Sequence, residues 1–341
     1  MTYVPPRRSD GTKLTHRKPL PWPTDKPFRI LSIDGGGICG ILPASVLAEL
    51  ETRYLNGEAI GDYFDMIAGT STGGIIALGL SHGIKASDIR DMYAERGGKI
   101  FPPVSGVARV WRRVRRLQRY PYERKPLQDE LVRIFGDTAL GEARTRLCIT
   151  SFEGRHGEPW IYKTPHHPDY KRDRHASMVT VGLATAAAPT FFEALPNNGY
   201  VMIDGGLWAN NPVMNALVDA LTCFEIDRRQ VRILSLGCGE TEFEVSDAKA
   251  RGGLLHWWNV YWAAMRAQSK NALGQAYLLV GKDQVIRIDA PESGDSIDLD
   301  DYERAKDELP QMARSLVEAG GGDIERLFLQ EKTQQYVPQP E

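Results

Sequence analysis

One short stretch of the chain combines residue types that can carry out nucleophilic chemistry: residues 69–73 read GTSTG. An apolar run leads into it, and residues 75–78 are compatible with a helix, which is the strand–turn–helix context of a nucleophile elbow. A turn this tight leaves almost no room for side chains beside the serine, a condition that Gly69 and Gly73 meet. The turn would point the unpaired N–H groups of the following helix at the atom under attack. The pattern predicts Ser71 as a nucleophile. The alternative is a glycine-rich loop without chemistry, because so short a string also occurs by chance.

A run of glycines lies upstream of this turn. Residues 28–33 are typical of a short buried strand, residues 34–40 read DGGGICG, and residues 41–50 have the apolar spacing of a helix. A strand that passes through consecutive glycines into a helix makes a nest of backbone N–H groups, which can hold a phosphate or an oxyanion. A phosphate-binding P-loop is disfavoured because no Lys-Ser/Thr pair follows the glycines, and the dinucleotide-binding spacing is also absent. Gly35, Gly36 and Gly37 are therefore candidate oxyanion donors.

A carboxylate closes a third stretch of interest. Residues 200–203 predict a strand that ends in Asp204 and two glycines. The C-terminal edge of the sheet is where α/β folds place their sites, so Asp204 is a candidate base for Ser71. The alternative is that Asp204 caps a turn or the helix that begins near Pro212, although Asn210 and Asn211 are better placed for that role.

Two kinds of rival site are open. Chain order permits a Ser-His-Asp triad made of Ser71, Asp204 and His256, although His256 lies in an aromatic segment with helical spacing and not in a loop after a strand. A non-catalytic protein could instead use the glycine loop to bind a nucleotide. His166 and His167 lie in a proline-flanked segment and are interpreted as solvated loop histidines, so no metal site is predicted.

Strands alternate with helices along most of the chain. Further strands are expected at residues 147–150, 160–162, 231–236 and 285–288, and further helices at 125–135, 179–188 and 251–280. A pair of polar helices is expected within 298–329. The predicted organisation is an extended N-terminal arm at residues 1–27, a catalytic domain at 28–290 and a C-terminal helical extension at 291–341 that packs on it.

Composition describes an ordinary globular protein. The 341 residues are 42% hydrophobic and 25% charged, and the net charge of -2 gives no general attraction to nucleic acid. The four cysteines have no paired spacing, which favours reduced thiols. No run of about eighteen apolar residues predicts a membrane span, and the N-terminus has no apolar signal core. We therefore expect a cytoplasmic protein.

One segment carries concentrated positive charge. Residues 107–119 combine apolar positions at helical spacing with many arginines, as in a basic amphipathic helix. Such a helix could adsorb to anionic lipid headgroups, at about 1 kcal/mol for each basic side chain near the surface. It could equally be a solvated helix with one face on the core, or it could bind an acidic ligand or a subunit.

The three stretches together, DGGGICG at 34–40, GTSTG at 69–73 and DGG at 204–206, resemble the patatin-like phospholipase family in order and in their positions at strand ends. The resemblance covers residues 28–215 well and is weaker up to about 290. It implies an α/β protein, a three-layer α/β/α fold with a central, mostly parallel sheet. It also implies lipid acyl hydrolysis by a dyad, with Ser71 as nucleophile, Asp204 as base, an oxyanion hole around Gly35, Gly36 and Gly37, and no metal.

The size and the basic arm further resemble bacterial patatin-like effectors of anti-phage systems. This resemblance implies activation by a cyclic dinucleotide such as cyclic GMP-AMP and a membrane phospholipid as substrate, without nucleic acid polymers as partners. It also implies homo-oligomer formation on activation and a peripheral position at the inner face of the membrane.

Overall fold

Strand β1 (Phe28–Ile33) lies at the centre of the sheet in the computed structural model, which describes residues 3–9, 17–103, 120–239, 243–246, 250–251, 260–291 and 295–340. Each of its six residues is buried. It pairs in parallel with β2 (Met66–Thr70) and with β7 (Val231–Leu236). A strand buried on both faces has a nearly continuous apolar sequence, which is why residues 28–33 were predictable.

The sheet extends to both sides of β1 in the order β5-β6-β3-β2-β1-β7-β8, and β4 pairs with β3. Strands β3, β2, β1, β7 and β8 are parallel, whereas β4, β5 and β6 are antiparallel to their neighbours. The outer strands are β3 (Arg146–Glu153), β4 (Glu158–Lys163), β5 (Leu195–Asn197), β6 (Tyr200–Asp204) and β8 (Val285–Ile288). The expected mostly parallel sheet is confirmed.

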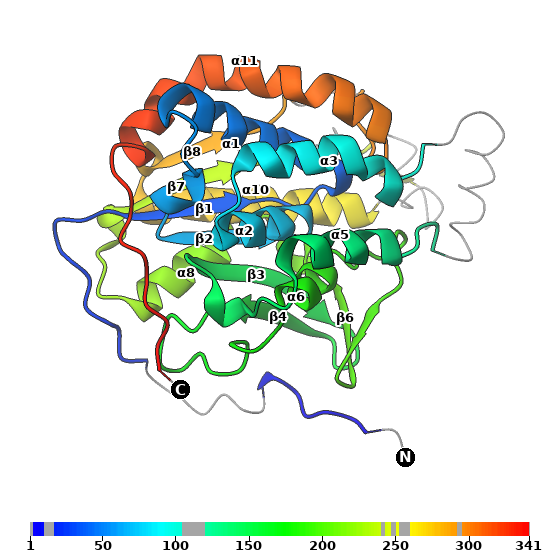
Figure 1. Ribbon diagram of the computed structural model, residues 1–341, viewed down its shortest axis with the longest axis horizontal. Helices are drawn as coiled ribbons and strands as arrows, with labels where there is room; N and C mark the ends of the chain where they lie inside the picture. The colour runs from blue at the N-terminus through cyan, green and yellow to red at the C-terminus, as the bar shows by residue number, and fades with distance from the viewer. Residues whose placement is uncertain are drawn as a thin grey trace.

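Helices cover both faces of the sheet. Leu31 and Ile33 of β1 belong to one apolar cluster, whereas Phe28 and Ile30 belong to another, as the two-residue repeat of a strand requires. The first cluster includes residues from α1 (Ile41–Tyr54), α2 (Thr72–His82), α3 (Ala86–Ile100), α5 (Lys125–Phe135) and α6 (Met178–Thr185). The second includes residues from α8 (Val213–Cys223) and α10 (Val260–Val280). The three-layer α/β/α architecture is therefore confirmed (Figure 1).

Helix α11 (Tyr302–Phe328) lies across α1 on the outside of the first layer (Figure 1). It is a single helix, so the expected pair of helices was wrong. The helix continues without a break because one of its faces is buried along its whole length. This burial offsets the cost of an unfavourable residue such as Pro310 inside the helix. The buried face consists of Tyr302, Ala305, Leu309, Ala313, Val317, Gly321, Ile324 and Phe328.

The N-terminal arm is tied to the body at several points. Trp22 packs against Phe28 and Phe224, with ring centroids 4.8 and 5.7 Å away. Arg8 forms a 2.7 Å ion pair with the buried Asp173. The division into arm, catalytic domain and C-terminal extension stays a prediction. Within the described ranges, no helix is long and apolar enough to cross a bilayer.

Candidate active site

Ser71 sits on the turn between β2 and α2. Its backbone has φ 54° and ψ -122°, a conformation that a residue with a side chain rarely adopts. A Cβ atom on Gly69 would lie 2.2 Å from the Gly73 carbonyl oxygen, and one on Gly73 would lie 2.3 Å from the Ile33 carbonyl oxygen. The turn therefore requires both glycines, and it stores backbone strain at Ser71, as functional turns often do. The Ser71 N–H donates to the Thr185 hydroxyl oxygen at 2.9 Å.

Asp204 reaches Ser71 along a strand that runs against the parallel part of the sheet. β3 pairs with β2 up to Thr150 opposite Thr70, and β6 pairs with the extension of β3 beyond that point. Asp204 lies opposite Ser151, which is at the level of Ser71. The sequence pattern predicted Asp204 at the C-terminal edge of the sheet, where α/β folds with parallel strands place their sites. That reason is wrong for β6, although the strand does end at Asp204.

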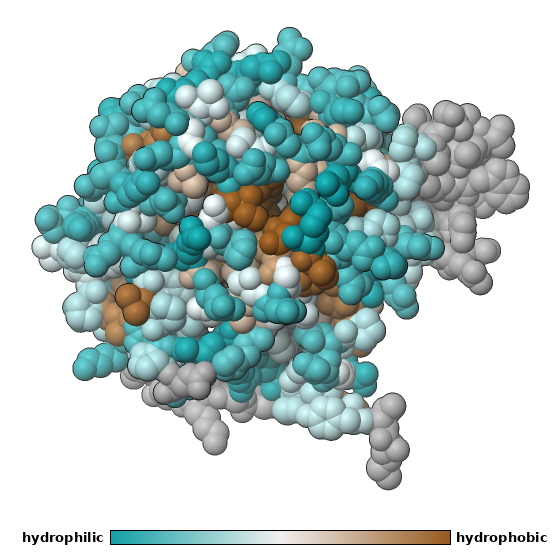
Figure 2. Space-filling model, in the orientation of Figure 1, coloured by the Kyte–Doolittle hydropathy of each residue, from teal (hydrophilic) through white to brown (hydrophobic). Residues whose placement is uncertain are grey.

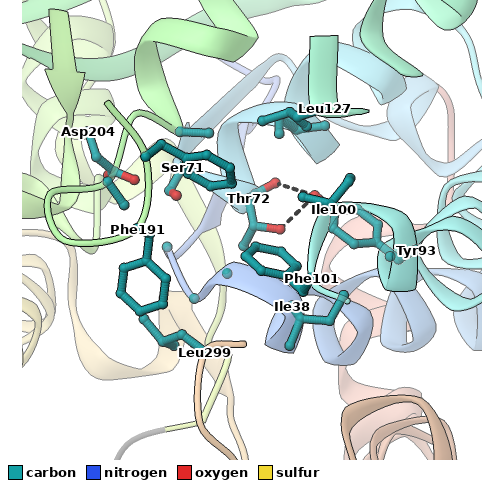
Figure 3. Close-up of a pocket in the computed structure, with 18 of the residues that line it drawn as sticks. Ile38, Ser71, Thr72, Tyr93, Ile100, Phe101, Leu127, Phe191, Asp204 and Leu299 are labelled. Atoms are coloured by element: carbon teal, nitrogen blue, oxygen red, sulfur yellow. Dashed lines mark hydrogen bonds between the residues drawn. The ribbon is translucent and has the colours of Figure 1, made fainter. Parts of the chain in front are cut away.

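The Asp204 carboxylate is buried beside the Ser71 side chain (Figure 3). The Gly206 N–H donates to its Oδ1 at 2.7 Å. Burial raises the pKa of Asp204 to about 6, against the opposite effect of hydrogen bonds from the Ser71 hydroxyl and the Gly206 N–H. At neutral pH the group is therefore ionised but more basic than a carboxylate in water, as a general base must be.

The glycine loop borders the same space. The Gly35 N–H donates to the Asn210 carbonyl oxygen at 3.1 Å, so this group is already engaged. No partner within the described part of the chain accepts a hydrogen bond from the N–H of Gly36 or Gly37. Gly37 has φ 56°, a value suited to glycine. Of the three predicted oxyanion donors, Gly36 and Gly37 are therefore the ones available in this conformation.

An ion pair holds the start of this loop. Arg287 of β8 donates to Asp34 Oδ2 at 2.8 Å, and it also donates to Asp289 and to the Ser235 hydroxyl. Asp34 directly precedes the glycines, so Arg287 fixes where the loop leaves β1. Residue type and spacing do not reveal this role, because it is the sheet order β1-β7-β8 that brings position 287 beside position 34.

Ser71, Asp204 and the three glycines line one cavity, which together with its opening to solvent measures about 960 Å³. Apart from Asp204, its charged lining residues in the described part of the chain are Arg96 and Glu130, which form a 2.9 Å ion pair with each other. Figure 2 shows apolar side chains gathered over the region where Figure 1 places α3 and α5, which both contribute to the lining. A cavity with so apolar a lining suits a hydrocarbon chain. Its apolar walls include Ile38, Ile75, Met92, Ile100, Phe101, Leu127, Leu131, Phe191, Phe192, Trp262, Met265 and Leu299.

The predicted solvated histidines are in fact buried. His166 and His167 are 2% and 3% exposed, so that interpretation was wrong. His166 Nε2 lies 2.8 Å from Asp219 Oδ2, and Lys163 Nζ donates to Asp219 Oδ1 at 2.5 Å. Asp219 lies one helix turn before Cys223 in α8, and the side chains of His166, Asp219 and Cys223 are close enough together to hold a metal ion. The Lys163 ammonium already neutralises Asp219, so this cluster is better described as a buried charge network.

Two of the predicted features cannot be placed. His256 and residues 107–119 lie outside the described residues. None of the described residues that line the cavity is a histidine. In the described part of the site, the group facing Ser71 is therefore a carboxylate.

The site combines a serine on a strained strand–helix turn, a buried carboxylate and backbone N–H donors at the same edge of the sheet. This combination is typical of serine acyl hydrolases. The family model for patatin-like phospholipases matches residues 31–217, and the chain belongs to this family. It is thus a lipid acyl hydrolase, as predicted, and the non-catalytic alternative is disfavoured.

The similarity to several known proteins extends over more residues than the family model matches. A protein of Vibrio cholerae named cGAMP-activated phospholipase is 37% identical over 251 residues, which cover 68% of this chain and 70% of its own. Patatin-like protein 2 of Arabidopsis thaliana is 36% identical over 284 residues, covering 71% of this chain and 68% of its own. Among solved structures, VipD of Legionella pneumophila is 14% identical with a TM-score of 0.42, covering 86% of this chain and 67% of its own.

Proposed function

We propose that the enzyme cleaves phospholipid acyl esters through a Ser71–Asp204 dyad. One observation carries the proposal: the serine on the strained turn lies beside the buried Asp204 carboxylate, and both side chains line the same pocket (Figure 3). A serine hydroxyl is a poor nucleophile until a base takes its proton, and a fully solvated carboxylate is too weak a base for this task. Burial makes Asp204 basic enough to act without a histidine.

The reaction then follows two half-steps. Ser71 Oγ attacks the ester carbonyl carbon while its proton passes to Asp204, and the N–H groups of Gly36 and Gly37 stabilise the oxyanion. The leaving alkoxide takes the proton from Asp204 as the acyl-Ser71 ester forms. Water then attacks this ester with Asp204 again as base, and a fatty acid departs. The apolar cavity holds the acyl chain during both half-steps.

We further propose that a cyclic dinucleotide such as cyclic GMP-AMP activates the enzyme at the surface of a membrane and changes its oligomeric state. The support comes from relatives named cGAMP-activated phospholipase in Vibrio cholerae, Escherichia coli and Pseudomonas aeruginosa, which are 37%, 32% and 34% identical. Each alignment covers about two thirds of this chain and 70% of the relative.

Fatty acid release from phosphatidylethanolamine–phosphatidylglycerol vesicles tests both proposals. We expect cyclic GMP-AMP to raise the wild-type rate about 5–150-fold, the usual range for coupling between two sites. Light scattering should show a change in oligomeric state under the same conditions. Ser71→Ala protein should release no fatty acid with or without the nucleotide.

The two proposals can fail separately. Equal rates with cyclic GMP-AMP, with its linear counterpart and with buffer alone would contradict the activation proposal but leave the dyad intact. Release of fatty acid by the Ser71→Ala protein would contradict the dyad.

A further inference from the structure

Asn210 is hydrogen-bonded to the glycine loop and lines the cavity that Ser71 and Asp204 also line. It follows the short helix α7 (Gly206–Ala209) and lines the cavity. Its carbonyl oxygen accepts the Gly35 N–H at 3.1 Å. Asn210 therefore withdraws one donor from the loop that is expected to hold the oxyanion.

The side-chain oxygen of Asn210 lies near Gly35 and Gly206, the two glycines that adjoin Ser71 and Asp204. A methyl group on Gly35 would lie 2.6 Å from Asn210 Oδ1 and 3.3 Å from Ser71 Cβ. A methyl group on Gly206 would lie 3.1 Å from Asp204 Oδ1 and 3.3 Å from Asn210 Oδ1. This end of the amide is thus within reach of a carbonyl group bound beside Ser71.

The amide is poorly satisfied as it stands. Its buried Oδ1 has no hydrogen-bond partner, while Nδ2 lies 3.4 Å from the Ser269 hydroxyl oxygen. The oxygen and nitrogen of an amide exchange positions when the group turns over, and its surroundings decide which orientation is adopted. In the turned orientation, Oδ1 accepts a hydrogen bond from the Ser269 hydroxyl, and Nδ2 takes the position beside Gly35.

Electrostatics favours the turned orientation during catalysis. The Asp204 carboxylate and the developing oxyanion are both negative, so an amide oxygen beside them is repelled and an N–H group is attracted. The Ser269 hydroxyl accepts a hydrogen bond from Nδ2 in one orientation of the amide and can donate one to Oδ1 in the other, so it accommodates the change without loss.

We propose that Asn210 Nδ2 is a side-chain donor of the oxyanion hole, next to the N–H groups of Gly36 and Gly37. As Ser71 Oγ bonds to the ester carbonyl carbon and its proton moves to Asp204, the carbonyl π pair moves onto oxygen, and Asn210 Nδ2–H donates to that oxygen. This role rests on the proposed Ser71–Asp204 mechanism.

Two variants remove the donor: Asn210→Ala deletes the amide, and Asn210→Asp keeps its shape but offers no N–H group at neutral pH. We expect kcat/KM for 4-nitrophenyl butyrate to fall about 10²–10³-fold in both, the usual effect of losing one oxyanion donor. The loss should be less than tenfold for the matched thionoester, because the C=S sulfur accepts hydrogen bonds weakly. All proteins are assayed with cyclic GMP-AMP and without it.

Ser269→Ala is the matched control, because it removes the amide's neighbour and keeps the donor. Ser269→Ala should lose less activity than the two Asn210 variants, and its ratio of ester to thionoester rates should equal that of the wild-type protein. Equal losses on both substrates in the Asn210 variants would assign Asn210 to support of the loop or of Asp204 and overturn the proposal. Wild-type activity within threefold in Asn210→Ala, or failure of both variants to fold, would also overturn it. A wild-type protein inactive on both esters would instead contradict the Ser71–Asp204 mechanism.

Discussion

In an Asp204→Asn protein, kcat is expected to fall about 10³–10⁴-fold on phospholipid and on soluble esters. This is within the range that a general base contributes. Asparagine keeps the shape of the side chain and its contact with Ser71, but it cannot take the proton. KM should change little, because the acyl chain binds in the apolar cavity and not on Asp204. Steady-state kinetics on a soluble ester, with thermal melting to verify the fold, provides the measurement.

His256→Ala is the control for this prediction, because it tests the rival triad. We expect it to keep most of the esterase activity. A loss in His256→Ala as large as in Ser71→Ala would favour a Ser-His-Asp triad.

Asp219→Asn is expected to lower the free energy of unfolding by about 3–5 kcal/mol, as when one partner is removed from a buried ion pair. Asp219 is 2% exposed and contacts Lys163, His166 and Tyr170. Burial alone would raise the pKa of this carboxyl, but the interactions with His166 and Lys163 outweigh it and hold the pKa well below its usual range. The group is therefore charged at neutral pH, and its replacement leaves Lys163 uncompensated. Urea denaturation at pH 7 gives the value.

Asp169→Asn is the matched control for Asp219→Asn. Asp169 forms a 3.1 Å ion pair with Arg17 of the N-terminal arm, but the Asp169 side chain is 25% exposed. Partly exposed pairs contribute little, so a change within about 1 kcal/mol is expected. Equal effects of the two substitutions would contradict the assignment of Asp219 to a buried charge network.

The central strands β1, β2 and β7 were predictable because they are almost entirely buried and each ends in a local signal. Residues 28–33 and 231–236 are mainly apolar and enter glycine turns, and β1 and β7 occupy these ranges. The Ser71 turn was predictable because its two glycines are required by contacts within a few residues and with the adjacent strand.

Other features depend on contacts between distant parts of the chain, which no local pattern records. Helix α3 begins at Ala86 because the Glu51 carboxylate of α1 accepts hydrogen bonds from the N–H groups of Ala86 and Ser87. The burial of His166 depends on α8, and the position of Asp204 depends on the length by which β3 exceeds β2. In each case the partner lies more than thirty residues away, so residue type and spacing could not reveal it.

The pH dependence of covalent modification of Ser71 tests most directly whether Asp204 alone activates it. Fluorophosphonate labels an activated serine, and peptide mapping by mass spectrometry reports the rate of labelling at Ser71. Because the Asp204 carboxylate must be ionised to accept the proton, the rate should fall about tenfold per pH unit below its pKa of about 6 and level off above it. Asp204→Asn should label slowly at every pH, and His256→Ala should follow the wild-type curve. Wild-type labelling rates in Asp204→Asn, or a pH midpoint that disappears in His256→Ala, would contradict the account.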